Sequence, residues 1–268
     1  SVPVIHCVAP TVWAWGRWRA KKFATVMDGL LCLFPFEPDY FKPFGLDAHF
    51  IGHPEAFGDF LPAKPANKSV EEEEIKSNKI ILLPGSRLSE ISLILPEMLA
   101  ATAIIKRHDP NLNFVLPAVP YLLPMIQSLI AESGVTILDQ PKDLIPALQT
   151  SDAMIATSGT ITLQAALCGT VGVTCYRTSA FSGFIGRRLV DLDKVILPNA
   201  ILGRPLYPFY FQEAATGKTL AAATLDCLYD ANAKSSARQA AIELKSLLTG
   251  GAQSFDELVI SALKNWLD

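Results

Sequence analysis

Short apolar runs alternate with longer amphipathic stretches along most of the chain. From residue 79 onward, the apolar runs predict strands at 79–83, 112–117, 135–138, 152–156 and 171–175. The stretches between them carry apolar residues at helical spacing and predict helices at 88–107, 124–133, 142–149 and 160–168. The first of these helices is expected to kink or break at Pro96. Strands that alternate with helices form parallel sheets, so this part is predicted to be a doubly wound α/β domain.

The start of the chain shows the same pattern in a shorter form. Strands are predicted within 1–8 and near 29–33 and 48–51, with helical stretches at 17–27 and 37–43. Three strands with their helices make about half of a Rossmann-type unit. Residues 1–52 are therefore predicted to be the last part of a first domain, with roughly a hundred residues missing in front of it.

Prolines mark the seam between the two predicted domains, at Pro54, Pro62 and Pro65. The second domain is predicted to cover 53–215 and to include a proline-broken loop at 195–209. The remaining segment, 216–268, is predicted to form helices at 217–230, 233–248 and 253–267. The predicted fold class is thus α/β with two Rossmann-like domains, the first of them incomplete in this chain.

The most informative motif is the turn Pro84-Gly85-Ser86-Arg87 between a predicted strand and a helix. Gly85 lets the backbone approach a ligand closely, and the following helix directs free N–H groups and its positive dipole end to the same place. Ser86 is a plausible N-cap, and Arg87 suits two phosphate oxygens at once. The motif favours an anion site, most naturally for a diphosphate. A structural turn with an exposed arginine is the alternative.

A second turn, Ser158-Gly159-Thr160, repeats this arrangement after the strand at 152–156. Its hydroxyl groups and backbone N–H groups offer several donors to an anion, and Gln164 falls one turn into the helix that follows. Two such turns at the carboxyl ends of parallel strands are typical of a site for a nucleotide diphosphate. The alternative is that Ser158 and Thr160 only cap a helix.

Composition narrows the choice of partners. Half of the 268 residues are hydrophobic, and the mean hydropathy is +0.29. The apolar runs are nevertheless too short to span a bilayer, which favours a peripheral membrane protein over an integral one. A net charge of −3 argues against nucleic acid as a partner. The five scattered cysteines are predicted to be reduced, and neither they, the four histidines nor Asp191-Leu192-Asp193 predict a metal site, so no metal or other cofactor is expected.

Tryptophans interleave with cations near the start of the chain. Trp13, Trp15 and Trp18 alternate with Arg17 and Arg19, and Lys21 and Lys22 follow. Indole rings at a membrane interface with cations beside anionic headgroups are typical of membrane-surface proteins. We therefore predict an acceptor and membrane patch of Trp13, Trp15, Arg17 and Arg19. The alternative is that Trp13 and Trp15 are buried anchors of their loop.

The chain resembles the lipid-A-disaccharide synthases at motifs that follow one another over nearly its whole length. These are Val8-Ala-Pro-Thr-Val-Trp-Ala-Trp15, Leu33-Phe-Pro-Phe-Glu-Pro38, Ile51-Gly-His-Pro54, Leu82-Leu-Pro-Gly-Ser-Arg87, Ser158-Gly-Thr160, Tyr176-Arg177, Leu197-Pro-Asn199, Gly203-Arg204 and Gln212-Glu213. The resemblance implies a GT-B glycosyltransferase. Such an enzyme would move a diacylated glucosamine from its UDP-linked donor to an acylated glucosamine 1-phosphate (lipid X), forming lipid A disaccharide and UDP. It further implies a peripheral cytoplasmic enzyme on the inner face of the inner membrane, and it allows a homodimer.

The same resemblance implies roles for single residues. Arg87 would stabilise the departing UDP, and Gln164 would lie against the ribose. The remaining donor-binding residues would be Arg177, Asn199, Arg204 and Gln212. Surface salt bridging or loop capping is the alternative for the two later arginines. The family usually has glutamate where this chain has Gln164, so we expect UDP binding weaker by about 1–2 kcal/mol. The general base is expected in the segment missing in front.

Two other functions are open at this point. One is another UDP-sugar enzyme of similar fold, such as the peptidoglycan N-acetylglucosaminyltransferase or a UDP-N-acetylglucosamine epimerase, although the Trp13-Ala-Trp15 and Leu197-Pro-Asn199 segments fit these poorly. The other is a non-catalytic UDP-sugar-binding fragment, which Gln164 suggests.

Overall fold

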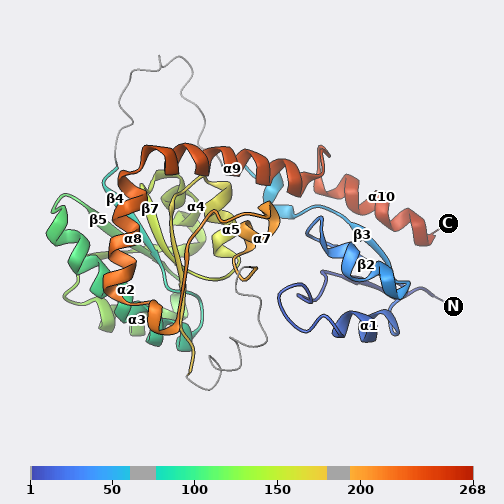
Figure 1. Cartoon of the computed structure of the whole chain (residues 1–268), viewed down its shortest axis with the longest axis horizontal. Coiled ribbons are helices and arrows are strands. Elements are labelled where there is room, and N and C mark those ends of the chain that lie inside the picture. The colour runs from blue at the N-terminus through green and yellow to red at the C-terminus, as the bar shows by residue number, and fades with distance from the viewer. Residues whose placement is uncertain (1, 61–76, 180–193, 268) are drawn as a thin grey trace, which may run out of the picture.

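The structure, a computed structural model, describes residues 2–60, 77–179 and 194–267. Figure 1 shows a larger domain built around one sheet, a smaller domain that contains β1–β3, and the C-terminal helices α9 and α10, which run from the larger domain to the smaller one. The predicted α/β class and the two Rossmann-like sheets are confirmed, since all paired strands in both sheets are parallel.

The smaller domain has a three-stranded sheet in the order β1-β2-β3. Its strands are β1 (Ile5–Cys7), β2 (Gly29–Cys32) and β3 (Asp47–Phe50), and α1 (Arg19–Ala24) connects the first two. The helix predicted at 37–43 is wrong, because two short 3₁₀ turns, Glu37–Tyr40 and Lys42–Phe44, occupy this stretch. Each turn carries a proline near its start, where a missing N–H costs nothing, and neither continues into an α-helix.

The larger domain has a six-stranded sheet in the order β6-β5-β4-β7-β8-β9. The strands are β4 (Lys79–Leu83), β5 (Asn113–Ala118), β6 (Val135–Asp139), β7 (Ala153–Thr157), β8 (Gly172–Tyr176) and β9 (Phe209–Phe211). From β4 the chain proceeds outward to β6, and from β7 it proceeds outward in the other direction. The strand order therefore reverses between β4 and β7, which is where doubly wound sheets bind ligands.

Helices cover both faces of this sheet. Ile80 and Leu82 face a core shared with α2 (Leu88–His108), α3 (Leu123–Ile130) and α8 (Gly217–Tyr229). Ile81 and Leu83 face the opposite core, shared with α4 (Gln140–Thr150), α5 (Ile161–Leu167), α7 (Leu197–Leu202) and α9 (Ala231–Thr249). The alternation of the two pairs along β4 is the period of two that a strand buried on both faces requires.

Helix α2 passes through Pro96 as one helix, so of the two outcomes predicted there, a kink or a break, the break is wrong. Pro96 lies on the exposed face of α2, where water can solvate the carbonyl of Ser92 that loses its N–H partner. Among the described residues, α2 is also the helix whose length and apolar composition would let it cross a membrane. Ile91, Leu95 and Met98 on its buried face belong to the core, so we assign it to the interior of the domain.

Helix α7 falls within the predicted loop at 195–209, and strand β9 begins at its last residue. Helix α7 has Pro198 in its first turn and ends at Gly203, which has φ +65°. Strand β9 begins at Phe209 and pairs with β8. Both elements are too short to produce a clear periodic signal.

The last helix, α10 (Phe255–Leu267), packs against the smaller domain. Its Trp266 lies edge-on to His49 of β3, with ring centroids 5.1 Å apart. A Cβ atom on Gly29 of β2 would lie 2.5 Å from the Trp266 ring, so a larger residue there would displace this ring. Leu258 of α10 packs beside Ile51, which is fully buried. The C-terminal segment is therefore in direct contact with the first sheet.

Candidate functional site

A cavity of about 460 Å³ opens at the carboxyl ends of β4 and β7, where the strand order reverses. Both predicted turns line it, together with residues at the ends of β5 and in α4 and α5. The lining residues are Leu83, Pro84, Gly85, Ser86, Arg87, Glu90, Pro117, Gln140, Leu144, Thr157, Ser158, Gly159, Thr160, Ile161 and Gln164. Its volume is within the usual range for small-molecule sites, which is about 300–1,000 Å³.

The first turn is built around a buried carboxylate. Gly85 has φ +104°, and a Cβ atom there would collide with Glu90 Oε2, so the turn requires glycine on both counts. Glu90 is 6% exposed, and its Oε1 accepts a hydrogen bond of 2.6 Å from Arg87 Nη1. The Arg87 side chain is 75% exposed, so Glu90 anchors a guanidinium that still faces solvent. This bond, and then the charge of Glu90, raise the pKa of Arg87.

The structure corrects the predicted role of Ser86. Helix α2 has Arg87 in extended backbone geometry at its N-cap position, without a side-chain cap. Ser86 contributes its backbone carbonyl instead, which accepts a hydrogen bond from the Tyr121 hydroxyl. The first N–H groups of α2 therefore have no side-chain acceptor at the N-cap, and they begin beside the cavity.

The second turn lies next to the first. Ser158 donates through its backbone N–H to the Cys175 carbonyl (3.0 Å) and through Oγ to the Val195 carbonyl (3.3 Å). Thr160 occupies the N-cap position of α5, but its side chain caps nothing, so the alternative that Thr160 only caps a helix is wrong. No atom would lie within 4 Å of a Cβ on Gly159, which therefore borders open space.

Thr157 is a cavity residue that the sequence analysis does not predict. It is 3% exposed, it lines the cavity, and its Oγ1 has no hydrogen-bond partner among the described residues. A buried hydroxyl without a partner is costly, so an oxygen of a ligand or of a water molecule in the cavity would satisfy it. Its position as the last residue of the strand before Ser158 was the available signal.

The side chain of Gln164 on α5 contacts Glu55, which the sequence analysis does not predict as a site residue. Its Nε2 donates a hydrogen bond of 2.8 Å to Oε1 of Glu55, which lies in the 3₁₀ turn Pro54–Phe57 that follows β3. Burial raises the pKa of Glu55, and the bond from Gln164 opposes that rise. The two residues are 109 positions apart in the sequence, so no local pattern could have paired them.

Arg177 and Gln212 lie together, one strand away from the cavity. Arg177 forms an ion pair with Glu97 (2.8 Å), and its Nε donates to the Gln212 carbonyl (3.2 Å). Gln212 has φ +53°, and its Oε1 accepts from the Thr178 backbone N–H (3.1 Å). Neither residue lines the cavity between the turns, so their assignment to donor binding stays a prediction.

Asn199 and Arg204 are also away from that cavity, and both have structural partners. Asn199 Oδ1 accepts from the backbone N–H groups of Leu206 and Tyr207 at 2.9 and 3.0 Å, which holds the loop after α7. Arg204 forms a bidentate pair with Glu243 of α9 at 2.6 and 2.9 Å. The structure does not bring these residues to the turns, and their role in donor binding remains untested.

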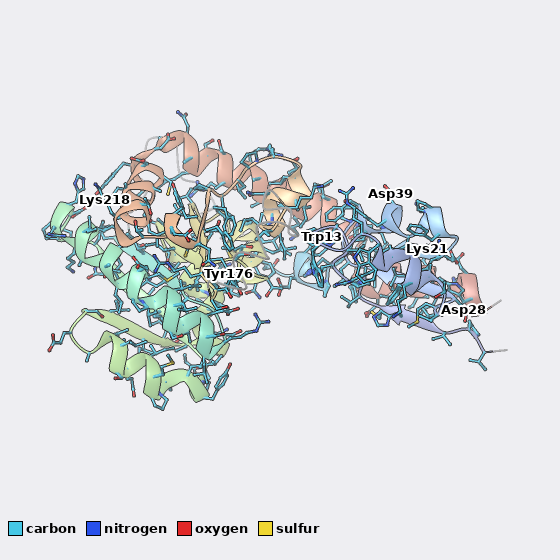
Figure 2. All side chains as sticks on the ribbon, turned by 60° about the horizontal axis from the view of Figure 1, so that its bottom comes forward. Trp13, Lys21, Asp28, Asp39, Tyr176 and Lys218 are labelled. Carbon is cyan, nitrogen blue, oxygen red and sulfur yellow. The ribbon has the colours of Figure 1, made fainter. Side chains whose placement is uncertain are left out.

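The tryptophan-rich segment divides into a buried and an exposed part. Trp13 is 4% exposed and belongs to the core, so its place in the predicted surface patch is wrong. Figure 2 shows it at the junction of the two domains. Trp15 is 44% exposed, with the Arg19 guanidinium 4.4 Å above its ring, and Arg17 lies over the Tyr40 ring at 5.5 Å. Trp18 is 71% exposed and joins this surface.

Trp13 packs edge-on against Phe34 and Phe36, and Glu37 accepts a hydrogen bond from its indole N–H. Glu37 is 2% exposed and accepts hydrogen bonds from Trp13 Nε1 (3.3 Å) and from the backbone N–H groups of Leu33 (3.1 Å) and Phe34 (3.0 Å). Burial raises the pKa of Glu37 to about 7, although these donors oppose the rise. The carboxyl group thereby fixes the loop between β2 and the 3₁₀ turns.

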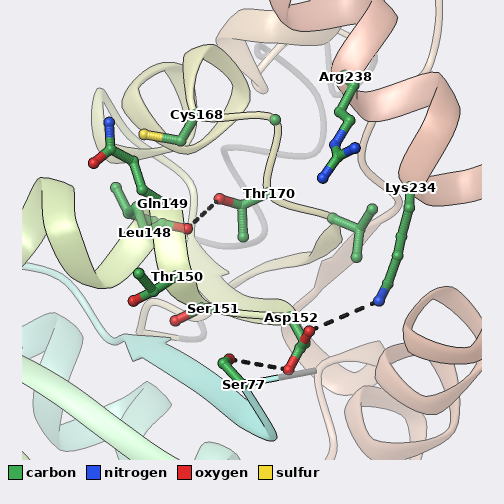
Figure 3. A pocket seen from close by; sticks show the side chains of 12 residues that line it. Ser77, Leu148, Gln149, Thr150, Ser151, Asp152, Cys168, Thr170, Lys234 and Arg238 are labelled. Carbon is green, nitrogen blue, oxygen red and sulfur yellow. Dashed lines mark hydrogen bonds and ion pairs between the residues drawn. The ribbon is translucent and has the colours of Figure 1, made fainter. Parts of the chain in front are cut away.

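A second cavity, of about 290 Å³, lies at the other end of the strands, beside the amino ends of β4, β7 and β8 (Figure 3). Its polar groups bind one another: Asp152 accepts from Ser77 Oγ at 3.0 Å and pairs with Lys234 at 3.7 Å. Thr170 Oγ1 donates to the Leu148 carbonyl at 2.9 Å. These contacts tie α9 and the strand starts together, so we assign this cavity a structural role.

The described part of the chain holds no cluster of three or more His, Cys, Asp or Glu side chains that could bind a metal ion. All five cysteines are free. Burial raises the pKa values of Cys168 and Cys175 to about 12, which keeps both as thiols. Asp191 and Asp193 lie outside the described residues.

The comparisons with known proteins agree with the motifs. The sequence model of the lipid-A-disaccharide synthetase family matches residues 1–261. The lipid-A-disaccharide synthase of Paraburkholderia xenovorans is 37% identical over 98% of this chain, and that of Burkholderia vietnamiensis is 39% identical over 86% of it. The chain spans 69% of the length of the first relative and 60% of the second.

Solved structures show the same fold at low identity. The calicheamicin glycosyltransferase has a TM-score of 0.52 and 16% identity, and the match covers 91% of this chain and 54% of that one. HepE of Anabaena, solved in complex with UDP and glucose, has a TM-score of 0.50 and 12% identity, and the match covers 98% of this chain and 71% of that one. At such identities the likeness extends to the fold alone.

Proposed function

The chain belongs to the lipid-A-disaccharide synthase family, and from this premise we propose that its protein joins two acylated glucosamines. The donor is a UDP-linked diacylated glucosamine, the acceptor is an acylated glucosamine 1-phosphate, and the products are lipid A disaccharide and UDP. The observation that carries the proposal is the cavity at the reversal of strand order, lined by both turns and by Arg87. Family membership favours catalysis over the non-catalytic alternative.

In this proposal UDP lies across the carboxyl ends of β4 and β7. Its diphosphate faces the N-terminus of α2, where free N–H groups and the helix dipole favour negative charge. Arg87 touches the same diphosphate and compensates the charge that appears on it as the glycosidic bond to the donor breaks. Glu90 holds the guanidinium in place through the 2.6 Å bond. Thr157 Oγ1 is available to a further oxygen of the ligand.

Arg87 thus takes the charge-compensating role that a metal ion has in other transferases. We expect UDP to bind this chain with the same affinity before and after addition of a chelator. Calorimetric titration of UDP, with and without the chelator, measures this. Binding that disappears with the chelator would show that a metal ion, and not Arg87, holds the diphosphate.

Acylated substrates place the enzyme at a membrane, and we propose that it binds peripherally at the inner face of the inner membrane. The exposed surface of Trp15, Trp18, Arg17, Lys21 and Lys22 supports this, because aromatic rings and cations together suit an anionic interface. Sedimentation with phosphatidylglycerol vesicles should remove more chain from solution than sedimentation with phosphatidylcholine vesicles. Replacing Trp18 with serine should reduce this difference, and an unchanged difference would contradict the assignment of the surface.

A further inference from the structure

Gln164 and Glu55 form a hydrogen-bonded pair at the edge of the nucleotide cavity. Gln164 lines the cavity from α5. Glu55 lies in the 3₁₀ turn Pro54–Phe57, where the chain passes from β3 to the larger domain. The bond of 2.8 Å between Gln164 Nε2 and Glu55 Oε1 therefore connects a cavity residue with the linker between the two sheets.

The bond determines which end of the Gln164 amide faces the ligand. A carboxylate only accepts hydrogen bonds, so it selects the NH₂ end of the amide. The carbonyl oxygen of Gln164 is then directed away from Glu55, and it accepts no hydrogen bond from any described residue. An amide without this partner could turn over and present its NH₂ group to the cavity instead.

Packing alone does not explain the carboxylate at position 55. Glu55 Oε2 is buried and has no partner among the described residues. A buried oxygen without a hydrogen bond lowers stability, whereas an apolar side chain of similar size would avoid that cost. The linker has other anchors nearby, because Gln149 Nε2 donates to the backbone carbonyls of Asp59 and Phe60 at 3.1 and 2.8 Å.

We propose that Glu55 is a positioning residue that holds the Gln164 amide with its carbonyl oxygen toward the bound nucleotide, where it accepts a hydrogen bond from a ribose hydroxyl. The proposal rests on the proposed function, since it requires UDP in the cavity. Glu55 itself does not touch the ligand. It sets how strongly the site distinguishes ribose from its deoxy forms.

The experiment is a calorimetric titration of the chain with UDP, 2′-deoxy-UDP and 3′-deoxy-UDP. The unaltered chain should bind UDP about 5-fold more tightly than at least one deoxy form, the effect of one neutral hydrogen bond. In Glu55→Leu the preference should disappear through weaker UDP binding, while affinity for that deoxy form stays the same. In Glu55→Gln, the new amide can accept from Gln164 or donate to it, so Gln164 can adopt either orientation. This variant should therefore retain a preference for UDP of about 2-fold.

Gln149→Leu is the matched control, because it removes hydrogen bonds to the same linker and does not touch the cavity. It should lower the melting temperature and leave the preference for UDP intact. If the control loses the preference as well, or if both Glu55 variants keep it in full, the positioning role is wrong while the UDP site stands. If the unaltered chain does not bind UDP, the proposed function and this inference fail together. Should Glu55→Leu not fold, Glu55→Gln decides between these outcomes.

Discussion

Replacing Arg87 with alanine should weaken UDP binding by about 1.5–3 kcal/mol, the range for a hydrogen bond to a charged group. The variant removes the guanidinium from the mouth of the cavity and leaves the buried Glu90 carboxylate without its partner. That carboxylate would then repel the diphosphate, which adds to the loss. Calorimetric titration of UDP against the unaltered chain and the variant measures the difference.

Arg107→Ala is the control for this prediction. Arg107 is an exposed arginine of α2 whose Nε donates to the Ala103 carbonyl at 3.2 Å, and it does not line the cavity. Its replacement should leave UDP affinity unchanged. Equal losses in the two variants would mean that the diphosphate does not lie at the first turn.

Glu37→Leu should lower the free energy of unfolding by at least about 3 kcal/mol. The substitution leaves three buried donors unpaired, namely Trp13 Nε1 and the N–H groups of Leu33 and Phe34, and each costs about 1–3 kcal/mol. Urea denaturation measures the change. Glu132→Leu, on an exposed glutamate, should change stability by no more than about 0.5 kcal/mol. A Glu37 variant as stable as the Glu132 variant would show that the carboxyl group does not hold this loop.

The raised pKa of Glu37 also predicts that the free energy of unfolding depends on pH. The pKa of Glu37 is raised from 4.5 to about 7 in the folded chain, so the folded state binds more protons at intermediate pH than the unfolded state. The contribution of Glu37 to stability is therefore fully present below pH 4.5 and is lost as the pH rises toward 7. Glu37→Gln should remove this component, which amounts to about 3 kcal/mol at most. Identical pH profiles of the variant and the unaltered chain would contradict the raised pKa.

The strands of the larger domain could be predicted from the sequence because burial on both faces gives continuous apolar runs. Ile80 to Leu83 is such a run, and Pro84-Gly85 ends it at the residue where the structure ends β4. The parallel order then follows from the alternation with helices, and with it the adjacency of the two turns. The sequence therefore predicts the two turns that line the cavity, but not the residues of β5 and α4 that complete it.

The remaining features depend on contacts that no local pattern encodes. Trp13 packs against Phe34 and Phe36 and donates to Glu37, which lies 24 positions away, whereas Trp15 and Trp18 are exposed. The sequence alone, in which Glu55 has no visible link to Gln164, predicts that Gln164 weakens UDP binding. A glutamate at position 164 would lie about 2.8 Å from a second carboxylate, where like charges repel. The Gln164 amide, unlike a carboxylate, can donate a hydrogen bond to Glu55 in the linker.

The central claim is that UDP binds across the first turns after β4 and β7. Hydrogen exchange of the chain with saturating UDP, read by mass spectrometry, tests it most directly. The account predicts slower exchange of backbone N–H groups at residues 85–90 and 158–161, which line or border the cavity, and unchanged exchange at 148–152 and 168–171 around the opposite cavity. Protection at the opposite cavity alone, or no protection at either turn, would contradict it.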